Sequence, residues 1–283
     1  MLTNLDRIQL AVPDAQAAAK TFAEYFGAVT LREGKLPHIQ ARVTVLCAGD
    51  SEVELLEATG EGPVKDFIDT WGGGLFGVGF ATPDMGEILV GLTKNQAQMT
   101  MVGEKIYLEP SPNTGLRAVI SPTPDTERTR VGLLSHIYEV TNPVSDLQAA
   151  ADYYTELFGL DASKFNAISS DLYGYTGTLT LFDPPDRLDR IEVTQIADYG
   201  AAMGRFHKRR GNGLYMCFSE VDDFGALRDR LESAGARYDI DAPQKEGADP
   251  DVLFIHPKSL HGMLMGISLT GAAWRWSSGS AYH

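Results

Sequence analysis

The chain has 283 residues, 43% hydrophobic and 22% charged, which is enough apolar material for two domains with sizeable cores. Its formal net charge of −14 argues against a nucleic-acid partner, because binding a polyanion requires a clustered basic surface. No stretch approaches the roughly 20 apolar residues that a helix needs to cross a bilayer, so the sequence predicts no membrane partner.

The N-terminus and the cysteines indicate a location. The opening MLTNLDR lacks the basic and then apolar pattern of a signal peptide. Cys47 and Cys217 lie within apolar strand patterns, which favours buried thiols over a disulfide framework. We therefore expect a cytoplasmic protein. The one densely basic stretch, RFHKRR at residues 205–210, is interpreted as a solvated loop.

The first unit of the chain consists of one strand, one helix and two further strands. The strand is expected at residues 7–12 and the helix at 14–26. The alternating segments VTVLCAG and SEVELLEA predict half-buried strands near 41–47 and 52–58, joined by a Gly-Asp turn.

Three more units follow in order. A linker with a short helix leads to the second unit at 75–120, whose strands are predicted near 99–101, 105–109 and 116–120. The proline-rich, charged segment 121–130 is the predicted domain boundary. The third unit is expected at 134–196 and the fourth at 214–269. The predicted domains are residues 1–125 and 131–270, followed by a tail at 271–283 that packs its tryptophans on the second domain and then frays.

The units are repeats of one another. In both opening copies, thirteen positions separate an aspartate from the glycine that closes the helix: Asp14 from Gly27, and Asp146 from Gly159. A second pair of copies spans residues 72–92 and 211–238. Four strand–helix repeats in series predict a fold built from four equivalent units.

Two phrases carry a resemblance to a known family. RFHKRRGNGLYMCFSEVDD and FIHPKSLHGMLMGI resemble the vicinal oxygen chelate superfamily, which includes glyoxalase I, methylmalonyl-CoA epimerase, extradiol dioxygenases and bleomycin resistance proteins. These two segments are most similar in sequence to the epimerase-like branch. The resemblance covers nearly the whole chain and implies an α+β fold of two tandem domains, with four β-α-β-β-β units. It is specific for the fold and does not fix the activity.

The superfamily usually holds a divalent metal, and the resemblance implies where its ligands would lie. In the first domain the four positions fall on Arg7, Glu54, Gly77 and Val119. A guanidinium cannot ligate a cation, so we expect no metal here. Our hypothesis is that Arg7 pairs with Glu54 across the degenerate site, and the alternative is that Arg7 reaches solvent.

In the second domain the resemblance places the four ligand positions on His136, Glu192, Met216 and Gly266. A thioether is a poor ligand for hard divalent ions, and glycine has no side chain. We therefore expect no metal cofactor, and His136 and Glu192 would be the ligands if a metal were bound. A one-residue shift in register that brings in Tyr215 or His261 would restore a ligand and leave a metal-dependent dioxygenase as an alternative.

Strand alternation predicts a pocket in the second domain. His136 and Glu192 are predicted to act there as a metal-independent acid–base pair, with Tyr138 as a third catalytic residue. The predicted substrate-binding residues are Arg190, Thr194, Tyr215, Met216 and Phe218.

The predicted function is that of a glyoxalase-like isomerase, epimerase or lyase acting on a small carbonyl-bearing or aromatic compound. The alternative is a non-catalytic small-molecule-binding protein of the bleomycin-resistance type. The sequence leaves open which ligand is bound, and whether the units pair within one chain or across a homodimer.

Overall fold

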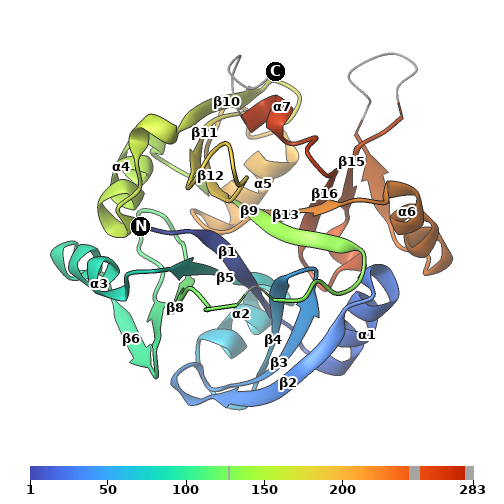
Figure 1. The fold of residues 1–283 in the computed structure, drawn as a ribbon, viewed down its shortest axis with the longest axis horizontal. Coiled ribbons are helices and arrows are strands. Elements are labelled where there is room, and N and C mark those ends of the chain that lie inside the picture. The colour runs from blue at the N-terminus through green and yellow to red at the C-terminus, as the bar shows by residue number, and fades with distance from the viewer. Residues whose placement is uncertain (127, 242–248, 278–283) are drawn as a thin grey trace.

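A computed structural model describes residues 1–126, 128–241 and 249–277. The described residues form two eight-stranded sheets with helices packed on them, which confirms the predicted α+β class. Figure 1 shows the first half of the chain, in blue to teal, below the second half, in yellow to red.

The first half contains three helices and one complete sheet. The helices are α1 (Ala15–Phe26), α2 (Pro63–Trp71) and α3 (Met85–Lys94). The strands are β1 (Asn4–Ala11), β2 (Val29–Leu36), β3 (Ala41–Ala48), β4 (Ser51–Ala58), β5 (Gly74–Thr82), β6 (Met99–Val102), β7 (Lys105–Leu108) and β8 (Ala118–Pro122). Their order across the sheet is β2-β3-β4-β1-β5-β8-β7-β6.

The second half repeats this plan. Its described helices are α4 (Leu147–Phe158), α5 (Ala202–Arg210), α6 (Phe224–Ser233) and α7 (Trp274–Ser277). Its strands are β9 (Leu134–Val144), β10 (Asn166–Ser170), β11 (Tyr175–Leu181), β12 (Arg190–Ile196), β13 (Met216–Val221), β14 (Tyr238–Ile240), β15 (Val252–Ile255) and β16 (Leu264–Leu269). The order β10-β11-β12-β9-β13-β16-β15-β14 matches that of the first sheet strand for strand.

The four units pair within one chain. The antiparallel pairs β1–β5 and β9–β13 join the first unit to the second and the third to the fourth. Each unit helix begins after an aspartate whose carboxylate accepts a hydrogen bond from the backbone N–H three residues on, which satisfies one of the free donors of the first turn. These aspartates are Asp14, Asp84, Asp146 and Asp223. The repeat seen in the sequence is therefore a repeat of helix starts.

The two halves share one hydrophobic core. Helix α1 packs against α6, and α3 packs against α4, so the helices of both halves meet between the sheets (Figure 1). The approach of α3 to α4 depends on Gly91, because a Cβ atom there would lie 2.5 Å from the carbonyl oxygen of Leu157. Hydrogen bonds also join the halves, such as the one that the Leu5 backbone N–H donates to the buried carboxylate of Asp189 at 2.6 Å.

The basic stretch at residues 205–210 is helical, so the prediction of a solvated loop is wrong. It belongs to α5, in which Met203, Gly204 and His207 are buried. These three positions form one narrow stripe, and charged residues occupy most of the rest. A helix with so few apolar residues carries a weak periodic signal. Arg210 is half-buried beside α2 of the first half, a contact that sequence spacing could not reveal.

The tail packs as expected where it is described. Trp274 and Trp276 lie against the apolar cluster on the second sheet, and residues 278–283 lie outside the described residues. Cys47 and Cys217 are free and buried, which confirms that prediction. Within the described ranges, no helix combines the length and apolar character that a membrane span requires.

Candidate functional site

Each sheet has a second face that is turned away from the shared core. On β1, Ile8 and Leu10 point into the shared core, so Arg7 and Gln9 take the opposite face. We call this face the first cup, which is covered by α2, and the equivalent face of the second sheet the second cup, which is covered by α7. Both cups combine apolar walls with buried charged residues.

The first cup holds the ion pair that the sequence suggested. Nη1 of Arg7 donates to Oε1 of Glu54 at 2.8 Å, and Nε2 of Gln9 donates to the other oxygen of Glu54 at 2.8 Å. Nη2 of Arg7 also donates to Asp6 at 2.6 Å and to Ser121 at 2.9 Å. Arg7 is 3% exposed, so the alternative that it reaches solvent is wrong.

Glycine on the neighbouring strand makes room for this arginine. A Cβ atom at Gly79 would lie 2.1 Å from Cγ of Arg7, because the arginine side chain crosses directly over β5. The guanidinium therefore occupies the middle of the cup, where the superfamily pattern places a metal ligand. Its charge is satisfied by surrounding carboxylates, including Glu52 at 3.6 Å.

In the second cup the arginine and its paired glutamate have exchanged strands relative to Arg7 and Glu52 in the first. Nε of Arg190 on β12 donates to Oε2 of Glu139 on β9 at 2.7 Å, and both side chains are buried. Glu192, two residues further along β12, accepts a hydrogen bond of 2.6 Å from the hydroxyl of Thr141. The Tyr175 hydroxyl donates a second hydrogen bond to Glu192. The cluster thus contains two carboxyl groups and one guanidinium.

The pKa of Glu192 lies close to neutral pH. Burial, followed by the nearby charge of Glu139, raises the pKa of Glu192 to about 8. Hydrogen bonds from Thr141 and Tyr175 oppose this shift without cancelling it. A carboxyl group with this pKa can both accept and return a proton near pH 7.

Arg190 has unused hydrogen-bonding capacity. Its side chain is fully buried, and Nη1 donates to the carbonyl oxygen of Leu188 at 3.2 Å. Nη2 has no hydrogen-bond partner among the described residues. A buried guanidinium N–H without a partner costs free energy, so a ligand oxygen placed here would stabilise the site.

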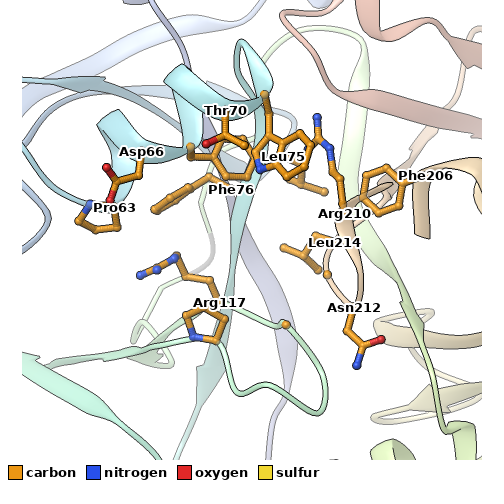
Figure 2. A pocket seen from close by; sticks show the side chains of 15 residues that line it. Pro63, Asp66, Thr70, Leu75, Phe76, Arg117, Phe206, Arg210, Asn212 and Leu214 are labelled. Atoms are coloured by element: carbon orange, nitrogen blue, oxygen red, sulfur yellow. The ribbon is translucent and has the colours of Figure 1, made fainter. Parts of the chain in front are cut away.

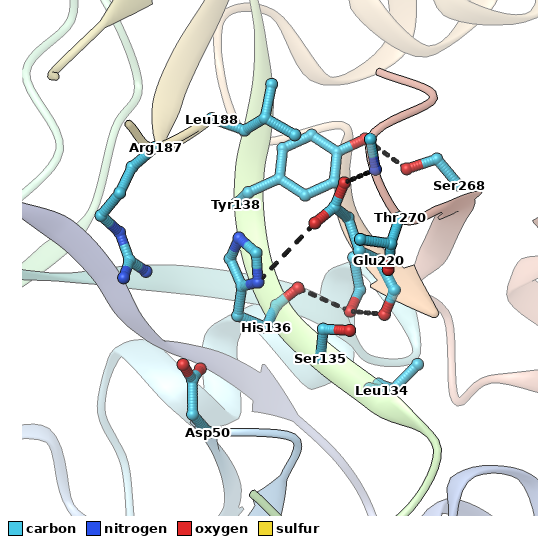
Figure 3. Close-up of polar contacts among 12 residues, drawn as sticks. Asp50, Leu134, Ser135, His136, Tyr138, Arg187, Leu188, Glu220, Ser268 and Thr270 are labelled. Atoms are coloured by element: carbon cyan, nitrogen blue, oxygen red, sulfur yellow. Dashed lines mark hydrogen bonds and ion pairs between the residues drawn. The ribbon is translucent and has the colours of Figure 1, made fainter. Parts of the chain in front are cut away.

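His136 lies apart from Glu192. Glu192 is opposite Thr141 in the parallel pairing of β12 and β9, five residues along β9 from His136, or roughly 16 Å at 3.3 Å per residue. Nδ1 of His136 instead lies 4.0 Å from Oε2 of Glu220, as Figure 3 shows. The structure therefore does not bring together the acid–base pair that the sequence suggested.

A bulge in β9 brings another residue, Glu139, to the face of the second cup. Ile137 and Val140 both belong to the shared core, so the two residues between them, Tyr138 and Glu139, both face the second cup. The pairing with β13 shifts register at this point. A bulge adds one residue to a strand and changes the direction of the side chains beyond it. His136 shares the face of Tyr138, with ring centroids 6.1 Å apart, so the predicted alternation holds there, and its distance along β9 is what separates it from Glu192.

Glu139 is the functional candidate that the sequence reasoning missed. It precedes the helix cap Asp146 by seven positions, as Arg7 precedes Asp14 by seven, whereas His136 precedes Asp146 by ten. The resemblance placed the first ligand position on His136, whereas the strand pairing makes Glu139 the counterpart of Arg7. Counting back from the capping aspartate would have found Glu139.

The remaining predicted residues either line the second cup or contact α5. Tyr138, Met216 and Phe218 form the apolar wall of the second cup, and the Tyr138 hydroxyl lies 3.1 Å from that of Ser268 (Figure 3). Thr194 is buried, and its hydroxyl contacts Sδ of Met203 at 3.3 Å. The Tyr215 ring packs on Phe206 of α5, with ring centroids 5.0 Å apart.

Neither cup offers a set of side chains that suits a divalent cation. In the first cup the Arg7 guanidinium fills the central position. In the second, Arg190 neutralises Glu139, and the expected third and fourth ligands are a thioether and a glycine, Met216 and Gly266. The described residues contain no group of three or more histidine, cysteine, aspartate or glutamate side chains suited to a metal ion.

Comparisons with known proteins agree with the repeated fold. Two family models, both described as Glyoxalase/Bleomycin resistance protein/Dioxygenase superfamily, match residues 6–108 and 133–250. A protein named ethylmalonyl-CoA/methylmalonyl-CoA epimerase, from Cereibacter sphaeroides, is 32% identical over 137 residues, which cover 48% of this chain and 96% of that protein.

Two solved structures extend over both halves. A mutant of 4-hydroxymandelate synthase from Streptomyces coelicolor is 14% identical and covers 95% of this chain and 92% of its own, with a TM-score of 0.69. A xylose isomerase-like TIM barrel/4-hydroxyphenylpyruvate dioxygenase fusion protein is 15% identical and covers 99% of this chain and 53% of its own, with a TM-score of 0.65. At these identities the likeness concerns the fold alone.

Proposed function

Because the chain belongs to the Glyoxalase/Bleomycin resistance protein/Dioxygenase superfamily, we propose that it is a glyoxalase-like enzyme of the isomerase or epimerase type. The reaction is the movement of a proton at a carbon atom beside a carbonyl group. It takes place in the second cup. The observation that carries this proposal is the buried Glu192 carboxyl group with a pKa of about 8, next to an arginine with a free N–H.

Glu192 moves the proton. In its carboxylate form it removes the proton from the carbon, and the electrons of the broken C–H bond shift to the carbonyl oxygen to give an enolate. The carboxylic acid then returns the proton to carbon and regenerates the carboxylate. A group with a pKa near the working pH populates both forms, which favours general acid–base catalysis. The face of the carbon that receives the proton decides between simple exchange and epimerisation.

Arg190 stabilises the charge that develops on the substrate oxygen. The unpartnered Nη2 supplies a donor, and the ion pair with Glu139 fixes the guanidinium in place. A preorganised donor aimed at a developing oxyanion is among the largest contributions to catalysis. In this proposal the guanidinium supplies the positive charge in the cup, so the reaction proceeds without a divalent metal.

The walls of the second cup suit a substrate with an apolar part. Phe218 and Tyr138 line it, and the Trp276 ring of α7 lies 6.4 Å from that of Phe218. Because α7 covers the cup, a substrate reaches Glu192 after α7 shifts. The relative named as an acyl-CoA epimerase makes a CoA thioester the first substrate class to test.

Hydrogen exchange at carbon tests the proposal directly. The purified protein is incubated in D2O with methylmalonyl-CoA and with smaller 2-substituted carbonyl compounds, and the loss of the α-proton signal is followed by NMR. We expect catalysed exchange with at least one compound. Glu192→Gln should lower the rate by at least about 100-fold, the usual contribution of a positioned acid–base group.

The matched control is Glu220→Gln, which changes another buried carboxylate of the second half. Its exchange rate should stay within about threefold of the wild-type rate, because Glu220 contacts His136 and the backbone of Gly271 and takes no part in the proton transfer. Equal loss in both variants would point to general destabilisation. Full exchange activity in Glu192→Gln would refute the assignment.

The second candidate function is non-catalytic binding of a small molecule. The aromatic wall and the covering helix α7 favour it, since together they would sequester an apolar ligand. In that case Glu192→Gln would change ligand affinity, and no compound would exchange its proton. Measuring both affinity and exchange in the same variant separates the two functions.

A further inference from the structure

A cavity lies at one edge of the first cup, where Phe67 and Phe76 of that cup face residues of the second half of the chain. It has a volume of about 400 Å³ and is bordered by α2 of the first half and by α5 and the loop after it in the second (Figure 2). None of the residues of the Glu192 cluster lines it. We call this cavity the interhalf cleft.

Its walls are aromatic and cationic. The guanidinium of Arg210 lies over the ring of Trp71, 4.5 Å from its centroid, and 5.2 Å from that of Phe206. The guanidinium of Arg117 lies 4.6 Å from the centroid of Phe76. Each half therefore contributes one arginine and at least one aromatic ring to the cleft. Flat apolar surfaces beside a cation suit a planar ligand with a negative charge.

The two arginines differ in how their charge is balanced. Arg117 makes an ion pair with Glu109 at 2.6 Å. Arg210 makes no ion pair with a carboxylate among the described residues, and its Nε atom is buried without a hydrogen-bond partner. Asp66 is the acidic residue of the lining, and among the described residues the ion pair of Arg117 is with Glu109 and not with Asp66.

Arg210 keeps its charge in this setting. Burial, followed by repulsion from Arg209, lowers its pKa to about 10, so the guanidinium is still protonated at neutral pH. Half-burying a cation without an anion is unfavourable, and an incoming anion relieves that cost. The cation–π contacts hold the guanidinium at the mouth of the cleft and leave its N–H groups to donate.

We infer that the interhalf cleft binds a planar small molecule that carries a carboxylate, with the carboxylate on Arg210 and the flat part against Trp71 and Phe76. The carboxylate accepts hydrogen bonds from the guanidinium, which forms planar paired contacts with such groups. The ligand bridges the two halves, because its contacts come from α2, α5 and the segment around Arg117. This site is separate from the proposed reaction in the second cup and does not depend on it.

The test uses benzoate as the probe and the full chain as the protein. Saturation-transfer NMR follows binding to the wild type and to Arg210→Gln. We expect saturable binding to the wild type and a dissociation constant at least about tenfold higher in Arg210→Gln, because a charge-assisted hydrogen bond is lost. Benzyl alcohol, which has the same ring and no charge, should bind at least about tenfold more weakly than benzoate.

Two controls isolate the site. Lys208→Gln removes one positive charge from an exposed position of the same helix and should leave benzoate affinity unchanged. Glu192→Gln, which alters the second cup, should also leave it unchanged. Arg210→Lys keeps the charge and loses the planar fork, so it should weaken binding even if Arg210→Gln fails to fold.

Three outcomes would overturn the inference. They are the absence of saturable benzoate binding to the wild type, undiminished affinity in both Arg210 variants, and an equal loss of affinity in Lys208→Gln. A loss confined to Glu192→Gln would place the benzoate in the second cup and refute the interhalf cleft as its site, while supporting the cup as a binding site.

Discussion

The two cups hold the same ion pair with its charges exchanged between strands. In the first cup Arg7 on β1 lies opposite Glu52 on β4, and in the second Glu139 on β9 lies opposite Arg190 on β12. The next carboxyl group along the strand then has a different environment. Glu54 accepts hydrogen bonds from Arg7 and Gln9, whereas Glu192 accepts them from neutral hydroxyl groups.

This exchange of arginine and glutamate between strands shows how one fold can hold a structural cluster in one half and a proton-transfer group in the other. A positive charge beside a buried carboxylate favours its ionised form, and a negative charge favours its protonated form. Arg7 lies against Glu54 in the first cup. In the second cup the charge of Glu139 acts on Glu192. We therefore expect variants of the first cup to change stability and variants of the second to change chemistry.

The largest effect should come from removing the first-cup arginine. Arg7→Met leaves Asp6, Glu52 and Glu54 buried without their shared cation, so the free energy of unfolding should fall by about 3–5 kcal/mol. Urea unfolding measures it. Arg42→Met is the control, because it breaks the exposed ion pair with Glu57 and should cost less than about 1 kcal/mol. Equal costs in the two variants would contradict a structural role for the first cup.

A moderate effect should appear in the pH dependence of stability. Between the ordinary pKa of 4.5 and the folded pKa of about 8, the folded protein holds a proton on Glu192 that the unfolded chain has lost. This contribution to stability is complete below about pH 4.5 and is lost as the pH rises through 8. Relative to wild type, Glu192→Gln should therefore gain up to about 1.4 kcal/mol per pH unit over this window.

Urea unfolding of both proteins at pH 5.5, 6.5 and 7.5 gives that difference, and pH effects common to both proteins cancel. Parallel curves for wild type and Glu192→Gln would show that the carboxyl group of Glu192 titrates normally. The proposed proton transfer would then lose its physical basis.

The smallest effect should come from the histidine that the sequence favoured. His136→Gln should leave the α-proton exchange rate within about threefold of wild type, because His136 lies beside Glu220 and far from Glu192 along β9. The D2O experiment described for Glu192 measures this rate. A loss as large as that in Glu192→Gln would restore His136 as a catalytic residue and place the reaction at the Glu220 side of the second sheet.

The fold was accessible from sequence because its signals are local. An aspartate that caps a helix and a glycine that closes it lie within one helix length, so Asp14 with Gly27 and Asp146 with Gly159 reveal the repeat without any tertiary contact. The exposed strand β2 was missed, because its apolar and polar residues alternate only over residues 29–32 and almost all of its side chains are exposed.

Only part of the candidate site could be predicted from the sequence. The contact between Arg7 and Glu54 followed from the ligand positions that the family resemblance implies, and the structure contains it. Alternation placed His136 on the face of Tyr138, but it could not show that His136 lies far from Glu192 along β9, or that a bulge turns Glu139 to the same face. Glu139 could have been predicted from the sequence, because it precedes its helix cap by seven residues, as Arg7 does.

By itself, the sequence determined the four units, their capped helices and their tandem order, since each depends on residues close in the chain or on repeated spacing. The tertiary structure decided which units pair, how the bulge directs the side chains of β9, how α7 covers the second cup and how α5 meets α2 at the interhalf cleft. These features depend on contacts between segments far apart in the chain. One such contact raises the pKa of Glu192, through burial and the charge of Glu139 on the neighbouring strand.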